Sequence, residues 1–329
     1  MINRRRFMAS SAALLAGASM GAGQGWADTG GDRRMLFGYP PGAIGSELGK
    51  GALQLLAGVG GPSYRLDNVE GRNTRLACET AKAGPADGMT LLQAQSTTLC
   101  LLPNIFKAQT YDAAKDFLPL ASVGEMTLSL TVGPAVPPSV TTLEHFLDWL
   151  ADNPDYRNVG FSIYGSDGHL STLILARATG TTIKPQPYKG SLMMINDLLN
   201  KTLAAGVTAA GNGGLDLWKS GKLRTLGVTA AQRLSYWPTV PTLAEQGIKG
   251  MDLTTWFGWF APALTPSSVT APLLEKIAAM QASAAYRELH ERLLLTQGKY
   301  SADQLRERII RDRERYAALV AQYGPAKID

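Results

Sequence analysis

The residues nearest to a catalytic constellation lie in one short stretch, YGSDGH, which runs from Tyr164 to His169. Serine hydrolases use a serine, a histidine and an aspartate, and Ser166, Asp167 and His169 supply these three types. Triad members normally converge from separate segments, because three residues this close along the chain cannot line up in relay. The nucleophile elbow also needs glycine two residues before the serine, where Tyr164 stands. We therefore interpret this stretch as a binding turn and keep a serine-dependent hydrolase as an alternative.

Metal and cofactor chemistry finds no support in the sequence. No spacing of His, Cys or Glu is typical of a metal site. His145 and His290 lie in helical segments of mixed charge, where we expect them at the surface. A Walker A loop requires Gly-Lys-Ser/Thr, but Gly49-Lys50 is followed by Gly51. The sequence therefore predicts no metal, no cofactor and no enzyme.

The stretch FGYPPGAIGSELGKGALQLL, from Phe37 to Leu56, offers a different chemistry, the binding of an anion. A strand-like segment ends at two prolines, a glycine-rich turn follows, and a helix is predicted from Ser46. The first N–H groups of a helix lack partners and carry partial positive charge. Gly45 leaves room for a carboxylate to approach the backbone there. The alternative interpretation is a tight connection that binds nothing.

Two further turns share this layout. LLQAQSTTLCLLP, from Leu91 to Pro103, places three hydroxyl side chains after a strand-like segment. FSIYGSDGHLSTLILA, from Phe161 to Ala176, places a Gly/Ser/Asp turn before a helix that is predicted to begin near His169. Ligands of α/β proteins bind in the crevice at the carboxyl ends of the strands. The three turns together predict a cleft that holds an anion with backbone amides and hydroxyls, without an arginine.

The start of the chain, MINRRRFMASSAALLAGASMGAGQGWADTG, has the form of an export signal. A basic head precedes an apolar run and small residues that end at Ala27, so we expect residues 1–27 to be removed near Ala27. Arg4–Met8 resembles the twin-arginine signal, and an ordinary secretory signal is the alternative. Residues 1–27 hold three arginines and no acid, so their removal lowers the formal charge from +5 to +2. That balance is too small for a nucleic-acid-binding face.

The 329-residue chain is long enough for two domains, and its strand-like and helical segments alternate. This alternation predicts an α/β fold with parallel βαβ units. The predicted strands are Leu36–Tyr39, Thr90–Ala94, Ser129–Val132, Asn158–Ile163 and Leu223–Thr229. Capping-box spacing predicts helix starts near Thr141 and Ser301. Cys78 and Cys100 are predicted to be buried free thiols, with a disulfide as the alternative.

Six stretches, in this order, resemble one family. They are YPPGAIGSELGK, DGMTLLQAQSTT, YDAAKDFLPLASV, PYKGS, SGKLRTLGVTAAQR and WPTVPTLAEQGIKGMDLTTWFGWFAPALTP. The family is that of the Bug-type solute-binding receptors of tripartite tricarboxylate transporters. The similarity extends from about Phe37 to the C-terminus, and Lys222–Arg233 and Pro238–Pro266 are its most specific parts.

The resemblance implies a two-lobed fold like that of type II periplasmic binding proteins, with hinge strands near Ser129–Val132 and Leu253–Phe260. One lobe would comprise residues 28–129 and 254–329, and the other residues 130–253. Such a receptor is expected to be a periplasmic monomer that captures a small carboxylate for membrane transporter subunits. A receptor that serves a membrane signalling partner is the alternative.

The resemblance also implies that the three turns line the cleft and that Tyr188-Lys189-Gly190-Ser191 stands near its wall. The predicted ligand-binding residues are Tyr39, Gly42, Ala43, Ile44, Gly45, Ser46, Ser96, Thr97, Thr98, Gly165, Ser166, Asp167, Gly168, His169, Tyr188, Lys189 and Thr208. The sequence departs from the family at residues 43–46, which replace a glycine run, and at Thr208, which replaces an acidic residue. Asp167 adds a negative charge. Ile44 suggests an apolar ligand body, so we expect an aromatic or branched carboxylate.

Overall fold

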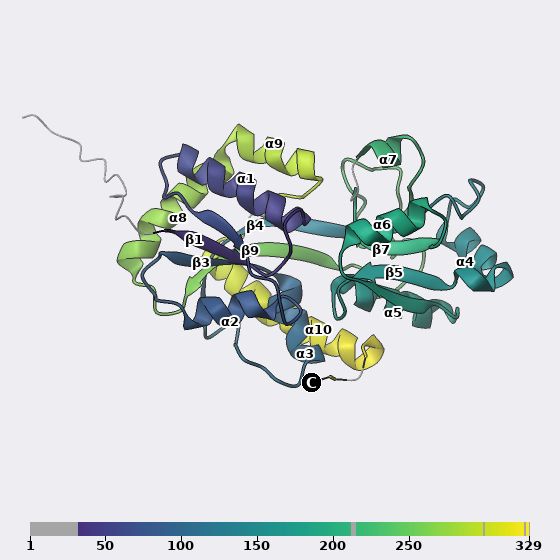
Figure 1. Cartoon of the computed structure of the whole chain (residues 1–329), viewed down its shortest axis with the longest axis horizontal. Helices are drawn as coiled ribbons and strands as arrows, with labels where there is room; N and C mark the ends of the chain where they lie inside the picture. The colour runs from purple at the N-terminus through teal and green to yellow at the C-terminus, as the bar shows by residue number, and fades with distance from the viewer. Residues whose placement is uncertain (1–31, 212–214, 299, 326, 329) are drawn as a thin grey trace, which may run out of the picture.

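The protein forms two α/β lobes joined by extended strands, as Figure 1 shows. The computed structural model describes residues 32–211, 215–298, 300–325 and 327–328. The predicted export signal, residues 1–27, lies outside the described residues. The predicted fold class, a two-lobed α/β fold with crossing strands, is confirmed.

The sheet of the first lobe combines strands from both ends of the chain. Its order is β2 (Arg65–Asn68), β1 (Arg34–Phe37), β3 (Thr90–Gln95), β9 (Thr254–Pro262) and the first part of β4 (Phe117–Val132). β1 is parallel to β2 and β3, whereas β9 is antiparallel to β3 and β4. The sheet is therefore mixed rather than wholly parallel, because β9 enters it from the second lobe.

The sheet of the second lobe is built around the end of β4. β7 (Ala205–Ala209) and β8 (Arg224–Val228) both pair with β4 in antiparallel fashion. β5 (Asn158–Ser162) is parallel to β7 and to the edge strand β6 (Lys184–Tyr188). Two prolines in β6, Pro185 and Pro187, suit an edge position because proline cannot donate to a central ladder.

The two sheets share one strand, β4. Phe117 to Thr127 pair with β9, and Leu128 to Val132 pair with β7 and β8. The chain returns to the first lobe at Thr254, where β9 begins. The predicted hinge segment Ser129–Val132 lies wholly in the second sheet, so β4 changes partners just before it.

Helices cover both faces of the first sheet (Figure 1). α1 (Ile44–Gly58), α8 (Ser267–Ala282) and α9 (Ala284–Leu293) pack on one face, and α2 (Arg75–Ala83) and α10 (Ala302–Tyr323) on the other. The second lobe carries α4 (Leu143–Asp152), α5 (Asp167–Thr179), α6 (Ser191–Leu199) and the short α7 (Leu215–Lys219). The remaining elements are the π-helical turn η1 (Thr97–Leu101), α3 (Leu102–Ile105) and the 3₁₀ turn η2 (Pro154–Tyr156).

Side-chain caps fix several helix starts. Ser301 and Gln304 form the predicted capping box of α10. Thr142, one residue after the position expected, accepts a hydrogen bond from the backbone N–H of His145. α1 begins at Ile44, two residues before the predicted Ser46, because the Ser46 hydroxyl is buried and donates to the carbonyl of Pro40 (2.9 Å).

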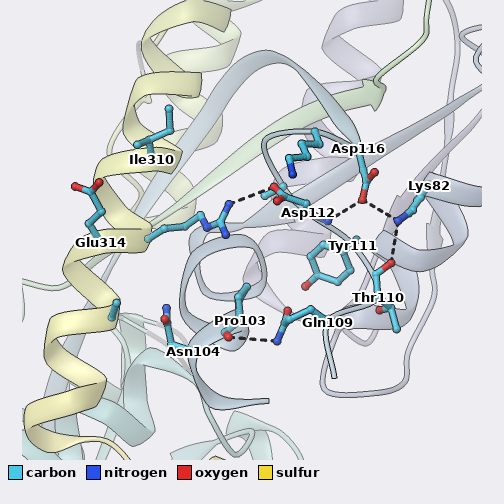
Figure 2. Close-up of a pocket in the computed structure, with 14 residues that line it drawn as sticks. Lys82, Pro103, Asn104, Gln109, Thr110, Tyr111, Asp112, Asp116, Ile310 and Glu314 are labelled. Carbon is cyan, nitrogen blue, oxygen red and sulfur yellow. Dashed lines mark hydrogen bonds and ion pairs between the residues drawn. The ribbon is translucent and has the colours of Figure 1, made fainter. Parts of the chain in front are cut away.

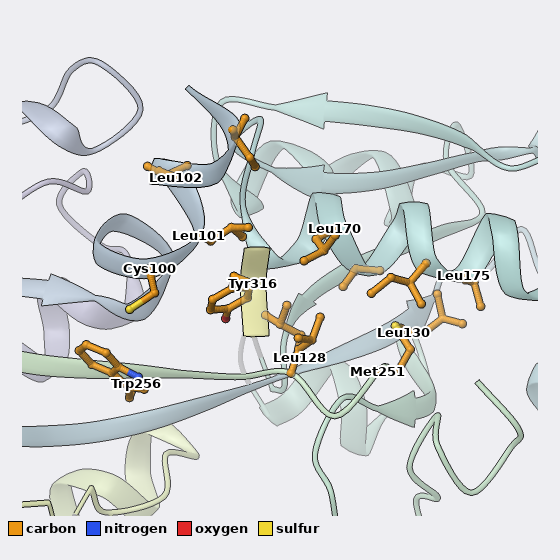
Figure 3. Close-up of a cluster of buried hydrophobic side chains, with 14 of the residues drawn as sticks. Cys100, Leu101, Leu102, Leu128, Leu130, Leu170, Leu175, Met251, Trp256 and Tyr316 are labelled. Atoms are coloured by element: carbon orange, nitrogen blue, oxygen red, sulfur yellow. The ribbon is translucent and has the colours of Figure 1, made fainter. Parts of the chain in front are cut away.

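One hydrophobic core runs through both lobes on the α10 side. It joins Trp256 and Leu305 of the first lobe to Leu130 and Leu170 of the second. Figure 3 shows Tyr316 of α10 among these side chains, where the two lobes meet. α10 therefore ties the lobes together along one edge.

Three single-residue expectations can be compared with the structure. Cys78 and Cys100 are buried and free, as predicted. The prediction that His290 lies at the surface is wrong, because its ring is buried between the carbonyls of Tyr286 (2.8 Å) and Val123 (2.9 Å). Among the described residues, no helix has the length and apolar character that a membrane span requires.

Candidate functional site

A cavity of about 100 Å³ lies between the lobes. The first lobe lines it with Tyr39, Ala43, Ile44, Gly45, Gln95, Thr97, Met126 and Thr255. The second lobe lines it with Leu128, Ser162, Ser166, Asp167, Gly168, Ser191, Val207, Thr208 and Ala209. The cavity therefore exists only while the two lobes face each other.

The start of α1 forms one wall of the cavity. Ala43 is its N-cap and no side chain caps the helix, so the first helical N–H groups have no side-chain acceptor. The buried Gln93 amide donates to the carbonyl of Gly45 (2.7 Å) and accepts from the Trp259 indole (3.0 Å). Core side chains thus hold this helix start in place.

The second predicted turn contributes a single hydroxyl to the cavity, that of Thr97. Ser96 is fully buried and its Oγ accepts from the backbone N–H of Trp256 (3.3 Å). Thr98 bonds to Thr74 Oγ1 (2.7 Å), also in the core. The turn forms the π-helical η1, a conformation that is often found at functional sites.

The start of α5 forms the opposing wall. Ser166 is its N-cap and accepts a hydrogen bond from the N–H of His169 (3.2 Å). Gly165 takes a φ of 81°, in the left-handed region that glycine tolerates. Ser166 and Gly168 face the cavity, so two helix starts from different lobes meet there.

The Asp167 carboxyl group connects the lobes. It is buried, with 3% of the residue exposed, and it accepts hydrogen bonds from Thr97, Thr255 (3.0 Å) and Tyr316. All three donors belong to the first lobe or to α10. Burial raises the pKa of Asp167 above its usual range, and the hydroxyl donors act against this shift.

His169 lies behind the cavity wall in an aromatic stack. Its ring is 4.5 Å from that of Phe161 and 4.4 Å from that of Tyr164, between centroids. Its Nδ1 accepts from the N–H of Gly165 (3.2 Å), and burial lowers its pKa to about 4. The ring is therefore neutral near pH 7, when it offers no positive charge to an anion.

The remaining predicted residues divide between the wall and its surroundings. Thr208 lines the cavity, as does Ser191 at the start of α6. The hydroxyl of Tyr188 donates to Asp197 (2.8 Å) outside the cavity, and Lys189 is exposed and is not among the lining residues. Gly42 and Ser46 shape the α1 turn without reaching the cavity.

Among the described residues that line the cavity, sequence reasoning missed seven. They are Gln95, Met126, Leu128, Ser162, Val207, Ala209 and Thr255. The resemblance placed Ser191 near the wall, without naming it as a ligand-binding residue. Met126 and Leu128 flank the point where β4 changes partners, and Thr255 follows the point where β9 begins. The position of Met126, Leu128 and Thr255 on the crossing strands could have identified them, because residues on such strands face the space between the two lobes.

The charge of the cavity is unusual for an anion site. The lining residues that the structure describes include no lysine, arginine or histidine, and Asp167 is the only one of them with a carboxyl group. Positive potential must therefore come from helix starts, and those of α1, α5 and α6 reach the cavity, each equivalent to roughly half an elementary charge.

A larger hollow of about 740 Å³ lies on the first lobe, between α10 and residues 103–116 (Figure 2). Its Lys82 pairs with Asp116 (3.0 Å), and its Arg313 pairs with Asp112 (3.2 Å). One lobe alone forms this hollow, so closure of the lobes cannot enclose a ligand in it. The interlobe cavity is the better candidate site.

Two lobes that enclose a small cavity define a solute-binding protein of the periplasmic type. The chain belongs to the receptor family of tripartite tricarboxylate transporters, because the family model TctC, "Tripartite tricarboxylate transporter family receptor", matches residues 63–324.

Known proteins agree with this assignment. Protein BugT of Bordetella pertussis is 27% identical over 296 residues, which cover 88% of this chain and 89% of BugT. Rpa4515 of R. palustris, solved with adipate, is 25% identical with a TM-score of 0.82 over 90% of this chain and 98% of its own. BugD, solved as a periplasmic binding protein, is 21% identical with a TM-score of 0.81 over 90% and 99% of the two chains. The Bug-type resemblance is confirmed.

Proposed function

We propose that this protein captures a small carboxylate in the interlobe cavity, in the periplasm, and presents it to the membrane subunits of a tripartite tricarboxylate transporter. One observation carries the proposal: the starts of α1 and α5 meet at a single cavity lined by hydroxyl groups. Helix starts and hydroxyls are donors that suit a carboxylate. The adipate in Rpa4515 is a carboxylate of this kind.

The volume and the lining of the cavity restrict which ligands can fit. An apolar cavity of about 150 Å³ holds benzene, and the cavity here measures about 100 Å³. Ile44, Met126, Leu128 and Val207 give it an apolar part. Of the two ligand types expected from the sequence, a short branched carboxylate fits this conformation, whereas an aromatic one requires the lobes to move apart.

The local geometry argues against the hydrolase alternative. Ser166 Oγ accepts from the backbone N–H of His169, and the His169 ring bonds to the backbone of Gly165. The Asp167 carboxyl group bonds to three hydroxyls of the other lobe. The three side chains therefore have separate structural roles, which favours binding over catalysis. A receptor for a signalling partner would use the same cavity and differ in its partner.

We also propose how the protein is exported and where its two lobes begin and end. Removal of residues 1–27 near Ala27 would deliver a monomeric receptor to the periplasm. The lobes would be residues 28–129 with 254–329, and residues 130–253. The strand pairing, which changes partners at Thr127 and Leu128, supports boundaries close to these.

Thermal unfolding with a panel of carboxylates tests the proposed function. Butyrate, isovalerate, hexanoate, succinate, adipate and benzoate would each be added in excess to the mature protein. A ligand at one hundred times its Kd stabilises a protein by about 2.7 kcal/mol, which raises Tm by several degrees. We expect such a shift with at least one short carboxylate, and none with the corresponding amide. No shift with any carboxylate would contradict the proposal.

Replacing Ser166 by alanine should affect both folding and binding. The N-cap of α5 is lost, so we expect the free energy of unfolding to fall by about 1 kcal/mol. A turn hydroxyl that only faced solvent would contribute little to stability, whereas the Ser166 hydroxyl caps a helix. A hydrogen bond to the ligand is also lost, and the affinity should fall about tenfold to a hundredfold. Urea unfolding and calorimetric titration measure the two effects.

Ser301→Ala is the matched control, because Ser301 also caps a helix but lies outside the cavity. It should reproduce the loss of stability and leave the affinity unchanged. Equal affinities for the wild type and Ser166→Ala would remove Ser166 from the binding site.

A further inference from the structure

The strongest feature that the proposed function leaves unexplained is the Asp167 carboxyl group. Among the described residues that line the cavity, Asp167 alone carries a carboxyl group, and it is buried at the start of α5. Its partners Thr97, Thr255 and Tyr316 come from three different elements, η1, β9 and α10. The three converging hydroxyl donors form a site for one carboxylate. The Asp167 side chain fills this site.

The donors around Asp167 are therefore not available to a ligand. A dicarboxylate held between the lobes needs donors at both of its ends. At the Asp167 end, the three hydroxyls are already engaged by the protein.

The charge of the site adds a second argument. The starts of α1, α5 and α6 together contribute roughly one and a half positive elementary charges. An ionised Asp167, the first residue of α5, offsets most of that amount, so what remains suits one ligand carboxylate and not two. Within the described part of the chain, no basic side chain lines the cavity that could balance a second ligand carboxylate. A second carboxylate beside an ionised Asp167 would also be repelled, because like charges at short range in a partly buried site are poorly screened.

We propose that Asp167 makes the cavity selective for ligands with a single carboxylate, because its own carboxyl group takes the position that the second carboxylate of a diacid would need. The proposal rests on the proposed function, carboxylate binding in the interlobe cavity. The ligand then places its carboxylate at the start of α1, where no side chain accepts from the first helical N–H groups, and its remaining atoms against Ile44, Met126, Leu128 and Val207. The ligand class is a short aliphatic monocarboxylate.

Matched pairs of acids test this selectivity in the wild type. Butyrate and succinate differ only by the exchange of a methyl group for a carboxylate, as do isovalerate and methylsuccinate. Calorimetric titration at pH 7.5 should show that the monocarboxylate of a pair binds at least tenfold more tightly. Equal or tighter binding of the dicarboxylates would overturn the inference and leave the proposed function intact. Failure of all four acids, and of the wider panel, to bind would instead count against the proposed function.

Asp167→Asn tests the residue itself. Asparagine keeps the shape of the side chain and removes its charge, and its amide group can donate as well as accept. We expect the ratio of monocarboxylate to dicarboxylate affinity to fall at least tenfold, with succinate gaining affinity. An unchanged ratio would overturn the role of Asp167. If this variant does not fold, the wild-type ratio alone still decides the proposal.

Asp197→Asn is the matched control. Asp197 lies in the same lobe and also accepts a hydroxyl hydrogen bond, from Tyr188, but it does not line the cavity. The substitution removes the same unit of charge from the protein. It should leave the affinity ratio unchanged, and a change equal to that of Asp167→Asn would show that the effect arises from overall charge.

Discussion

Arg308→Met is expected to lower the free energy of unfolding by about 3–5 kcal/mol, the usual cost of removing one partner of a buried ion pair. Arg308 is 9% exposed and pairs with Glu125 of β4 and, at 3.4 Å, with Asp312 of α10. Its guanidinium also lies 4.5 Å from the centre of the Tyr300 ring. The substitution would leave two half-buried carboxylates without their cation, and urea unfolding measures the loss.

Arg306→Met on the same helix is the control for this prediction. Arg306 pairs with Asp303 at the surface, where an ion pair contributes less than about 1 kcal/mol. Its replacement should change the free energy of unfolding by less than about 0.5 kcal/mol. Equal losses for the two variants would show that the Arg308 pairs contribute no more than a surface pair.

Gly45→Val is expected to be the most damaging single change at the cavity. A Cβ atom at Gly45 would lie 2.5 Å from ring atoms of both Phe37 and Phe257, which are fully buried. From the sequence we expected glycine here to leave room for the ligand, but the missing side chain faces these rings instead. Overpacking costs about 1–3 kcal/mol and sometimes more. We expect the upper end of this range, together with at least a tenfold loss of carboxylate affinity as the start of α1 is displaced.

Gly58→Val, at the other end of α1, is the control for this prediction. It replaces a glycine of the same helix without crowding buried rings. A Cβ atom at Gly58 would meet no atom within 4 Å. The substitution should change stability little and leave the affinity unchanged. Wild-type stability and affinity in Gly45→Val would show that the two rings can move aside and that the start of α1 does not hold the ligand.

The sequence predicts the fold where the local signal is strong. β1, β3, β5 and β8 are short apolar runs between turn residues, and all four were predicted close to their observed bounds. β2 and β6 were missed, because these edge strands are polar or contain proline and show no apolar run. Most of β4 was missed because it is buried on both faces and shows no alternation.

For the candidate site, the sequence predicts less than it does for the fold. The glycine and hydroxyl content of the three turns predicted which loops approach the cavity. It could not show which hydroxyl of a turn faces inward: Ser96, Thr97 and Thr98 look equivalent in sequence, yet Thr97 alone lines the cavity. That distinction depends on the π-helical turn, which a sequence pattern does not specify. Thr255 and Ser191 come from distant segments, and only the family resemblance indicated their surroundings, a hinge strand for Thr255 and the cavity wall for Ser191.

The shared strands also set the order in which the chain can reach its native state. The first sheet is complete only when β9 inserts between β3 and β4, and the contact of Gln93 with Trp259 joins residues 166 positions apart. β5, β6, β7 and β8 all lie between residues 158 and 228. During synthesis the second lobe therefore emerges whole while the first still lacks β9, the strand that joins β3 to β4. Because long-range pairing is slow, we expect the second lobe to fold as an insertion and the first to close around it last.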